Sequence, residues 1–128
     1  MGTVQRFEDL EVWKRARVLT NRLYEVSSAG AFNRDFALRD QIRKAAISIM
    51  SCIAEGFERE SGDKDFRHFL SMAKGSTGEV RTQLIIAHDA KHLDDEQFNE
   101  LYAVSLEVSR MLSRFIAYLD GRNGNSNS

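Results

Sequence analysis

The sequence contains no proline and only one cysteine among its 128 residues. Because proline is the commonest helix breaker, its absence favours an all-helical protein made of long, uninterrupted segments. The single cysteine, Cys52, excludes an internal disulfide and indicates a reducing compartment. The sequence also lacks a secretory signal and an apolar run of about eighteen residues, the length that a membrane helix requires. We therefore expect a cytoplasmic protein that does not enter a membrane.

Positive and negative side chains are nearly equal in number. The 18 Lys and Arg residues against 19 Asp and Glu residues give a formal net charge of −1. This balance provides no overall attraction to nucleic acid or to an anionic membrane, and it leaves room only for a local basic patch. The length is sufficient for one domain with a hydrophobic core. We expect that domain over residues 1–120, followed by a disordered polar tail over residues 121–128.

Apolar residues recur at intervals of three and four along four segments, which is the period of an amphipathic helix. Asn33 or Asp35 is expected to cap the second helix, and Ser61 the third. The third helix is expected to continue to about Leu93, and Gly121 to close the fourth. No alternating strand pattern competes with this interpretation. Four such helices joined by short loops predict an all-α, antiparallel up-down-up-down four-helix bundle.

The third segment has more surface suited to packing than one core needs. Its inward stripe is predicted to comprise Phe66, Leu70, Ala73, Thr77, Val80, Leu84 and Ala87. Four small residues with the same spacing, Ser71, Gly75, Gly78 and Thr82, lie nearly opposite that stripe. Glycine inside a soluble helix costs about 1 kcal/mol relative to alanine, so two of them indicate a compensating close contact with another backbone.

The second segment repeats this pattern. Leu38, Ile42, Ala45, Ala46, Ile49 and Ile53 form its inward stripe, while Ile47 and Met50 face away from it. A helix that is apolar over most of its circumference is usually buried on more than one side, and in so short a chain a second subunit is the natural cover. We therefore predict a homo-oligomer whose interface contains Ile47, Met50, Ser71, Gly75, Gly78 and Thr82.

Several polar residues run beside these stripes. Gln41, Ser48 and Glu55 recur every seven residues on the second helix, and Glu79 lies next to Gly78 on the third. A carboxylate at a poorly hydrated interface needs a partner, and Arg43, Lys44 or Arg81 could supply one within the subunit or across an interface. Gln41, Arg43, Ser48, Glu55 and Glu79 are therefore interpreted as structural polar residues. Catalysis by the two glutamates would need a cleft and a nucleophile or water site, which the sequence does not supply.

The histidines do not form a convincing metal motif. His88 and His92 are four residues apart, a spacing that can place two ligands on one helix face, but the glutamate of a zinc protease is missing between them. Asp65 and His68 provide only one of the two motifs that a di-metal bundle needs. We expect solvated histidines, no metal and no cofactor. A metal-dependent enzyme or metal-binding bundle that uses Glu55, Glu79 and the histidines remains the alternative.

One flank of the third helix is basic. Arg67, Lys74 and Arg81 recur every seven residues, about 10 Å apart along the helix. A homo-oligomer would multiply them into a band that could contact RNA or DNA. A solvated face is the favoured interpretation, and nucleic acid is kept as the alternative.

Five sequence blocks resemble the bacterial family of 23S rRNA intervening-sequence proteins. They are Phe7-Glu8-Asp9-Leu10-x-Val12-Trp13, Gln41-Ile42-Arg43-x-Ala45-Ala46-x-Ser48-Ile49, Ile53-Ala54-Glu55-Gly56, Phe66-x-x-Phe69-Leu70 and Ala73-x-Gly75-Ser76-x-x-Glu79. The resemblance implies an up-down bundle that assembles as a ring-shaped homo-oligomer, with a pentamer expected. The accessory proteins of diversity-generating retroelements, usually strongly basic partners of a reverse transcriptase, are a more distant resemblance. The chain departs from the family at Cys52, where asparagine is frequent. Its near-neutral charge differs from that of the strongly basic retroelement proteins, which weakens the carry-over of their nucleic-acid binding.

These observations together predict a non-enzymatic, oligomeric helical bundle that serves as a scaffold or interaction module. Its expected partners are other copies of itself, with RNA, DNA or another protein as further candidates.

Overall fold

The protein is all α over the part of the chain that the structure describes. The computed structural model describes residues 4–127, and it describes the side chains of residues 4–122. Within this range the chain forms helices and no strand, as the sequence predicts. No helix of the described residues combines the length and the apolar character that a membrane crossing needs. The elements are η1 (Phe7–Asp9), α1 (Glu11–Ser27), α2 (Gly30–Arg34), α3 (Phe36–Glu58), α4 (Asp63–Asp89) and α5 (Asp95–Asn127).

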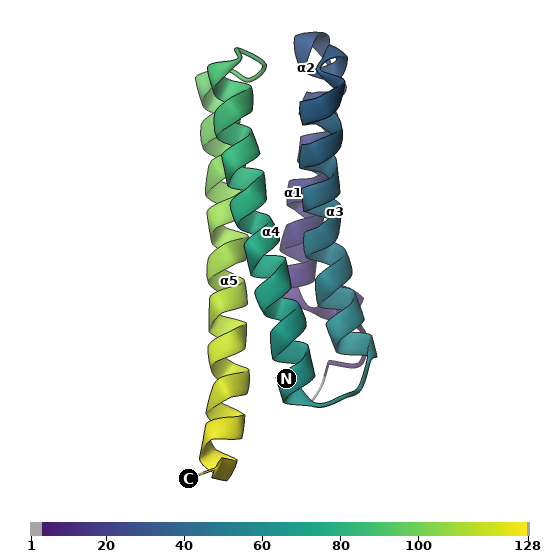
Figure 1. The fold of residues 1–128 in the computed structure, drawn as a ribbon, viewed down its shortest axis with the longest axis vertical. Helices are drawn as coiled ribbons and strands as arrows, with labels where there is room; N and C mark the ends of the chain where they lie inside the picture. Colours follow the sequence, from purple (N-terminus) through teal and green to yellow (C-terminus); the bar gives the residue numbers. More distant parts are fainter. Residues whose placement is uncertain (1–3, 128) are drawn as a thin grey trace.

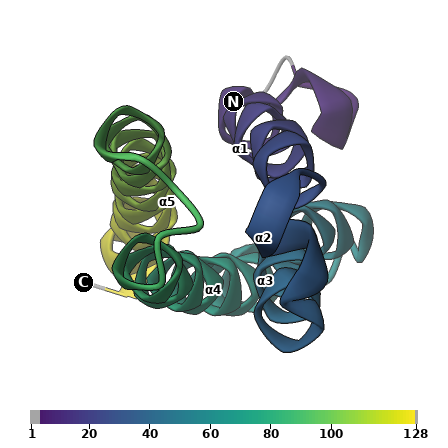
Figure 2. The ribbon, with the colours of Figure 1, turned by 90° about the horizontal axis from the view of Figure 1, so that it is seen from above.

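The four long helices lie side by side, and α2 sits at one end of them (Figure 1). The chain passes along α1 to the end that carries α2, returns along α3, and then passes along α4 and back along α5. Seen from above, α1 lies beside α3 and α5 lies beside α4 (Figure 2). The hydrophobic core therefore receives side chains from all four long helices.

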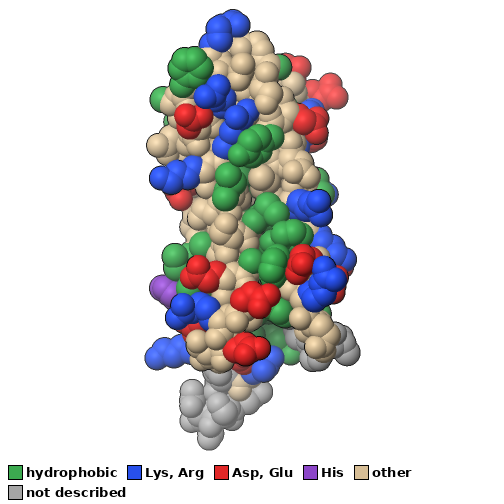
Figure 3. All heavy atoms as spheres, turned by 90° about the vertical axis from the view of Figure 1, so that its right-hand side faces the viewer, with side chains coloured by type: hydrophobic (Ala, Val, Ile, Leu, Met, Phe, Trp, Pro, Cys, Tyr) green, Lys and Arg blue, Asp and Glu red, His purple; other side chains and the backbone are tan. Residues whose placement is uncertain are grey.

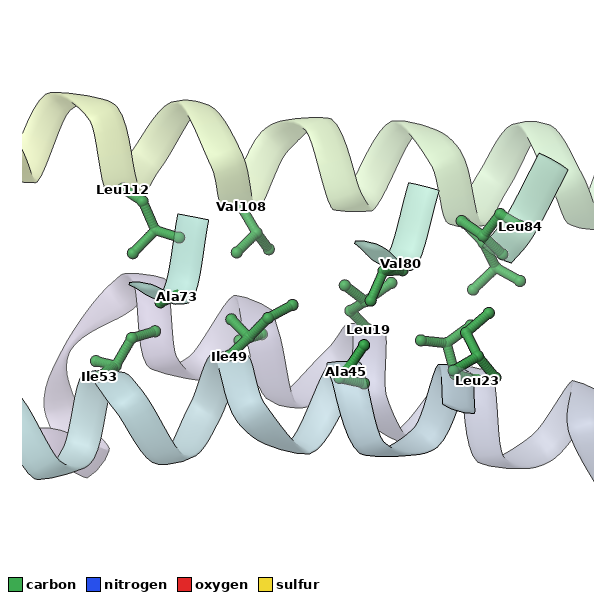
Figure 4. Close-up of a cluster of buried hydrophobic side chains, with 14 of the residues drawn as sticks. Leu19, Leu23, Ala45, Ile49, Ile53, Ala73, Val80, Leu84, Val108 and Leu112 are labelled. Carbon is green, nitrogen blue, oxygen red and sulfur yellow. The ribbon is translucent and has the colours of Figure 1, made fainter. Parts of the chain in front are cut away.

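The inward stripes agree with the buried residues. On α3 all six predicted positions are buried, and on α4 every predicted position is buried except Phe66, which is half-buried. Figure 4 shows side chains of these helices converging with Leu19 and Leu23 of α1 and with Val108 and Leu112 of α5. The spacing of apolar residues thus places the core correctly, because a 3.6-residue period brings such positions to one side of a helix.

The connection between α1 and α3 contains a short helix that the sequence analysis missed. Gly30 has φ +58°, and α2 begins there rather than the chain running directly into α3. Phe32 of α2 is only 1% exposed, so the short helix closes one end of the core. Of the two predicted caps, Asp35 is the one used: its side chain accepts a hydrogen bond from the amide of Leu38 at 3.3 Å.

The predicted cap of α4 at Ser61 is wrong. Gly62 occupies the capping position with φ +97°, and the Ser61 hydroxyl instead donates to the carbonyl oxygen of Arg59 at 3.2 Å. The reversal from α3 to α4 requires two residues with positive φ, Glu60 and Gly62. Glycine adopts a positive φ without a steric penalty. The need for such a residue at position 62 therefore sets where α4 begins.

Helix α4 also ends earlier than predicted. Lys91 has φ +65°, and its amide donates to the carbonyl of His88 at 3.0 Å, while the His92 amide donates to the carbonyl of Ala87 at 2.8 Å. These two bonds form a Schellman motif, which ends the helix at Asp89. The motif usually carries glycine at the left-handed position, so lysine there conceals the boundary in the sequence.

The start of α5 is fixed by a reciprocal cap. The Gln97 amide donates to Asp94 Oδ1 at 2.8 Å, and the Asp94 amide donates to Gln97 Oε1 at 3.1 Å. At the other end the helix continues past Gly121 to Asn127, so this glycine does not close it. The disorder expected for residues 121–128 stays a prediction.

Candidate interaction surface

The outward face of α4 carries small and apolar residues that the protomer leaves uncovered. Ser71, Gly75 and Thr82 are exposed, and Gly78 is half-buried. A Cβ atom added at Gly75 would have no neighbour within 4 Å, and one at Gly78 would approach only the Arg81 guanidinium, at 3.9 Å. Each glycine costs about 1 kcal/mol of helix stability relative to alanine. Nothing within the protomer therefore requires glycine at either position.

Gly56 on α3 shows what a required helical glycine looks like in this protein. It is buried, and an added Cβ would lie 2.7 Å from Phe69 Cβ and 2.9 Å from Phe66 Cδ1 of α4. The absence of a side chain at Gly56 is what allows α3 and α4 to approach closely at this point. Gly75 and Gly78 have no such neighbour in the protomer. A close contact made by another chain would explain why glycine stands at these two positions.

Three large apolar side chains on α4 extend this surface, and the sequence analysis did not identify them. Met72 is 45% exposed, Ile85 44% and Ile86 49%. The signal for two of them is the run Leu84-Ile85-Ile86, because successive residues differ by about 100° around a helix and cannot all face one core. In the structure Leu84 takes the buried position.

The other predicted interface residues lie on a different side of the molecule. Ile47 is 44% exposed and borders a shallow groove of about 300 Å³ between α3 and the chain around η1 and α1. Phe7 and Trp13 form one wall, with an edge-to-face ring contact at 5.3 Å. The side of the molecule that carries α3 shows hydrophobic side chains gathered near its middle (Figure 3). The groove is lined by Phe7, Trp13, Ile47, Met50, Ser51 and Ala54.

The structure therefore divides the predicted interface into two surfaces. We call the first the α3 groove, with the six lining residues just given, and the second the α4 face, made of Ser71, Met72, Gly75, Gly78, Thr82, Ile85 and Ile86. No residue of α4 lines the α3 groove.

Two of the predicted structural polar residues connect helices within the protomer. Arg43 donates from Nε to Ser27 Oγ at 2.8 Å and from a terminal nitrogen to Ser28 Oγ at 2.9 Å, and its guanidinium lies 4.5 Å from the centre of the Tyr24 ring. Ser48 accepts a hydrogen bond from the Ser76 hydroxyl at 3.1 Å. Arg43 thus joins α3 to α1, and Ser48 joins α3 to α4.

The other three polar residues have no such role inside the protomer. Gln41, Glu55 and Glu79 are exposed, and among the described residues none of them takes part in a side-chain hydrogen bond or ion pair. Their carboxylates and amide are hydrated in the single chain, so no partner is needed there. The pairing expected for Glu55 and Glu79 stays a prediction for a surface covered by another chain.

The basic flank of α4 is smaller than its sequence indicates. Arg67 forms an ion pair with Asp120 of α5, which also raises the pKa of the arginine. Arg81 donates to Thr77 Oγ1 at 3.2 Å and is half-buried. Lys74 is exposed and has no ion pair in the described part of the chain. The remaining positive charge, on Lys74 and Arg81, is too sparse to form a strong phosphate-binding stripe on one protomer.

The histidines are engaged with carboxylates rather than with each other. His88 Nε2 lies 2.7 Å from Asp95 Oδ1, and its ring stacks on Phe98. His92 lies beyond the end of α4, so the two rings do not share one helix face as expected. Its side chain is only 11% exposed, which corrects the expectation of a solvated ring. Across residues 4–122, no three His, Cys, Asp or Glu side chains gather in a way that could hold a metal ion.

His92 connects the turn between α4 and α5 to the start of α3. Its Nε2 lies 2.9 Å from Asp35 Oδ2, and its ring stacks on Phe32 of α2 at 5.3 Å. The hydrogen bond from His92, together with the Leu38 amide, holds the pKa of the Asp35 carboxyl below its ordinary value. The ionised carboxylate is therefore favoured in the folded state.

This contact predicts a pH-dependent effect of Asp35→Asn. Asparagine caps helices as well as aspartate does, so the variant loses mainly the charged contact with His92. Because the folded pKa of Asp35 is depressed, the stabilisation is present above the unfolded pKa of about 3.9 and is lost as pH falls through the folded value. Urea midpoints should show a deficit for the variant at pH 7 that shrinks at about pH 3. An equal deficit at both values would contradict this origin.

Comparisons with known proteins give one family. The family described as 23S rRNA-intervening sequence protein matches residues 8–114. A similar solved structure is that of a protein of unknown function from the S23 ribosomal protein family of Bacteroides thetaiotaomicron, which is 21% identical with a TM-score of 0.74. The match covers 82% of this chain and 97% of that one, and at this identity it shows the fold alone. No curated protein matches the chain.

Proposed function

The chain belongs to the 23S rRNA-intervening sequence protein family, and on this premise we propose that it is a non-enzymatic scaffold that assembles from copies of itself. In this proposal the protomer is an antiparallel up-down-up-down four-helix bundle in the cytoplasm. The assembly is a ring, and the family resemblance implies five copies. The observation that carries the proposal is the pair of uncovered glycines in the interior of α4. They weaken the helix and serve no contact within the protomer, whereas a second backbone could approach closely only where Cβ atoms are absent.

The exposed apolar side chains support the same proposal. Ile47, Met72 and Ile86 lie on the α3 groove or the α4 face, and each exposes more than two fifths of its surface. Single exposed apolar residues are ordinary, but several beside a glycine-containing helix face are typical of an interaction site. Covering them would bring the apolar gain that drives most association between protein chains.

The proposal predicts dissociation when bulk is added to the α4 face. Gly75→Leu and Gly78→Leu should each give a smaller native mass while retaining the helical circular dichroism signal, because the protomer has space for the new side chain. Leucine also has the higher helix propensity, so the protomer itself should not be destabilised.

Gly121→Leu is the matched control. Gly121 is likewise exposed on a helix with no neighbour within 4 Å of an added Cβ, but it lies on α5, away from the proposed interface. Its native mass should equal that of the wild type. If the two α4 variants keep the wild-type mass, the α4 face is not the interface.

The alternative of a metal-dependent enzyme has little geometric support. Glu55 and Glu79 are exposed on separate helices, while His88 and His92 are occupied by Asp95 and Asp35. The residues that the alternative requires therefore do not converge on one site. Stoichiometric metal in the purified protein, lost in Glu55→Gln or Glu79→Gln, would reverse this conclusion.

RNA or DNA is a secondary candidate partner, and Lys74 and Arg81 of α4, which form no ion pair among the described residues, support it. Lys74 and Arg81 would recur in every copy of a ring, which would strengthen the local positive potential. Any such binding should weaken with added salt and with Lys74→Glu and Arg81→Glu. Binding that persists in both variants would place the nucleic acid elsewhere. A protein partner beyond the chain itself is a further proposal, and pull-down from the native host with nuclease treatment would identify it.

A further inference from the structure

The α3 groove and the α4 face contain residues at the same height along the bundle. The hydrogen bond between Ser48 and Ser76 marks one level shared by α3 and α4. Ile47 precedes Ser48, while Gly75 and Gly78 stand one residue before and two residues after Ser76. At a rise of 1.5 Å per residue, all three lie within about 3 Å of that level.

The register between the two helices is the same further along. The ion pair between Arg59 and Asp65, at 2.9 Å, joins residues that are equally distant in sequence from Ser48 and Ser76. Helices α3 and α4 therefore keep one antiparallel register from Ser48 to the end of α3, which is nearly half of that helix, and heights can be compared between them.

Equal height matters for a ring. A rotation about an axis parallel to the helices leaves the height of every residue unchanged, so two surfaces of one protomer meet between copies at matching levels. Contacts between two different surfaces are head-to-tail, and they close into a ring when the rotation allows it. The α3 groove and the α4 face are two different surfaces.

Starting from the self-association proposed above, we propose that the α3 groove of one copy receives the α4 face of the next copy, with Ile47 seated between Gly75 and Gly78 of its neighbour. Ile47 protrudes, since 44% of its surface is exposed. The two glycines leave open space at its level, because a Cβ atom added at Gly75 would have no neighbour within 4 Å and one added at Gly78 would approach only Arg81, at 3.9 Å. The side chain of Ile47 could thus occupy the space that the two glycines leave open.

Charges on one edge of this contact are complementary. Glu79, beside Gly78 at the edge of the α4 face, lies one residue from the level of Lys44, and both are exposed without an ion pair among the described residues. Toward the other end of the bundle, Lys64 of α4 lies within two residues of the level of Glu58 on α3, and their signs are reversed. This alternation favours one register over others. On the opposite edge the proposed pairing would bring Lys74 toward Arg17, whose guanidinium lies 5.9 Å from the centre of the Trp13 ring of the groove. These two charges have the same sign, so apolar contact carries the association.

Disulfide trapping tests this pairing. Because Cys52 is the only cysteine, Cys52→Ala provides a background without thiols. Into it we would introduce Ile47→Cys in one preparation and Gly78→Cys in another, mix the two and oxidise them. A disulfide forms only when the two Cβ atoms are about 3.5–4.5 Å apart. The expected result is a linked pair containing one copy of each variant, and a ladder of linked multimers when both substitutions are in one chain.

A control at a different height sharpens the test. Ser71→Cys is on the same α4 face but about 9 Å from the level of Ile47, so its mixture with Ile47→Cys should link at most one tenth as much. Strong linking of Ile47→Cys with itself would indicate a two-fold contact and overturn the head-to-tail pairing. The native mass of the Cys52→Ala protein separates the two proposals. A monomer would defeat the proposed function, whereas an oligomer without the Ile47–Gly78 link would defeat only the present inference.

Discussion

Gly56→Ala is expected to destabilise the protein, although alanine is the better helix former. The added Cβ would lie 2.7 Å from Phe69 Cβ and 2.9 Å from Phe66 Cδ1. The Phe69 Cβ is attached directly to the backbone of α4, so no rotation of the side chain relieves the overlap, and the two helices must separate. Overpacking of this kind costs about 1–3 kcal/mol or more, which exceeds the gain of about 1 kcal/mol in helix propensity. Gly56→Leu should be more severe.

Chemical denaturation at one fixed protein concentration measures this effect, because the stability of an oligomer depends on concentration. Gly121→Ala is the control, since a Cβ at that position meets nothing within 4 Å. It should change stability by less than about 0.5 kcal/mol. If Gly56→Ala is as stable as the wild type, the close approach of α3 and α4 is not as the structure has it.

Leu70→Ala is expected to cost about 2–5 kcal/mol of unfolding free energy. Leu70 is fully buried on α4 and belongs to the central hydrophobic cluster. Truncation removes apolar contacts and leaves a cavity that a packed helical core fills only in part. With a domain of this size, such a loss should lower the melting temperature by several degrees or more.

Val18→Ala is a suitable control for Leu70→Ala, since it also removes apolar carbon from a helix. Val18 of α1 is 48% exposed, so little of the contact made by its methyl groups is lost on truncation. Its effect should stay within about 0.5 kcal/mol. A similar loss in the two variants would show that Leu70 does not contribute as a core residue.

The core was predictable because its signal is local and repeated. Leu70, Val80 and Leu84 satisfy the helical period over several turns, and the period alone assigns them to one side. The cap of α3 was predictable for the same reason, because the Asp35 side chain accepts a hydrogen bond from an amide only three residues later.

The features that sequence analysis missed depend on conformation or on distant neighbours. Lys91 ends α4 in a left-handed conformation that lysine seldom adopts, and nothing in its residue type announces this. Arg67 is neutralised by Asp120, which is 53 residues away in sequence. His92 leaves the helix face of His88 because the turn at Lys91 redirects the chain.

The candidate interface was predictable only as a list of residues. Helical periodicity shows that Ile47 and Gly75 point away from the core stripes, but it does not give the azimuth of one helix relative to another. The structure places these residues on two sides of the protomer and at one height. This placement changes the expectation from a single patch to two surfaces that could fit together.

The native mass of the purified protein tests the central claim most directly. Sedimentation equilibrium or light scattering at micromolar concentration should give one species whose mass is a whole multiple of 14.6 kDa, greater than one, with five copies expected. A stable species of 14.6 kDa throughout the concentration range would contradict self-association.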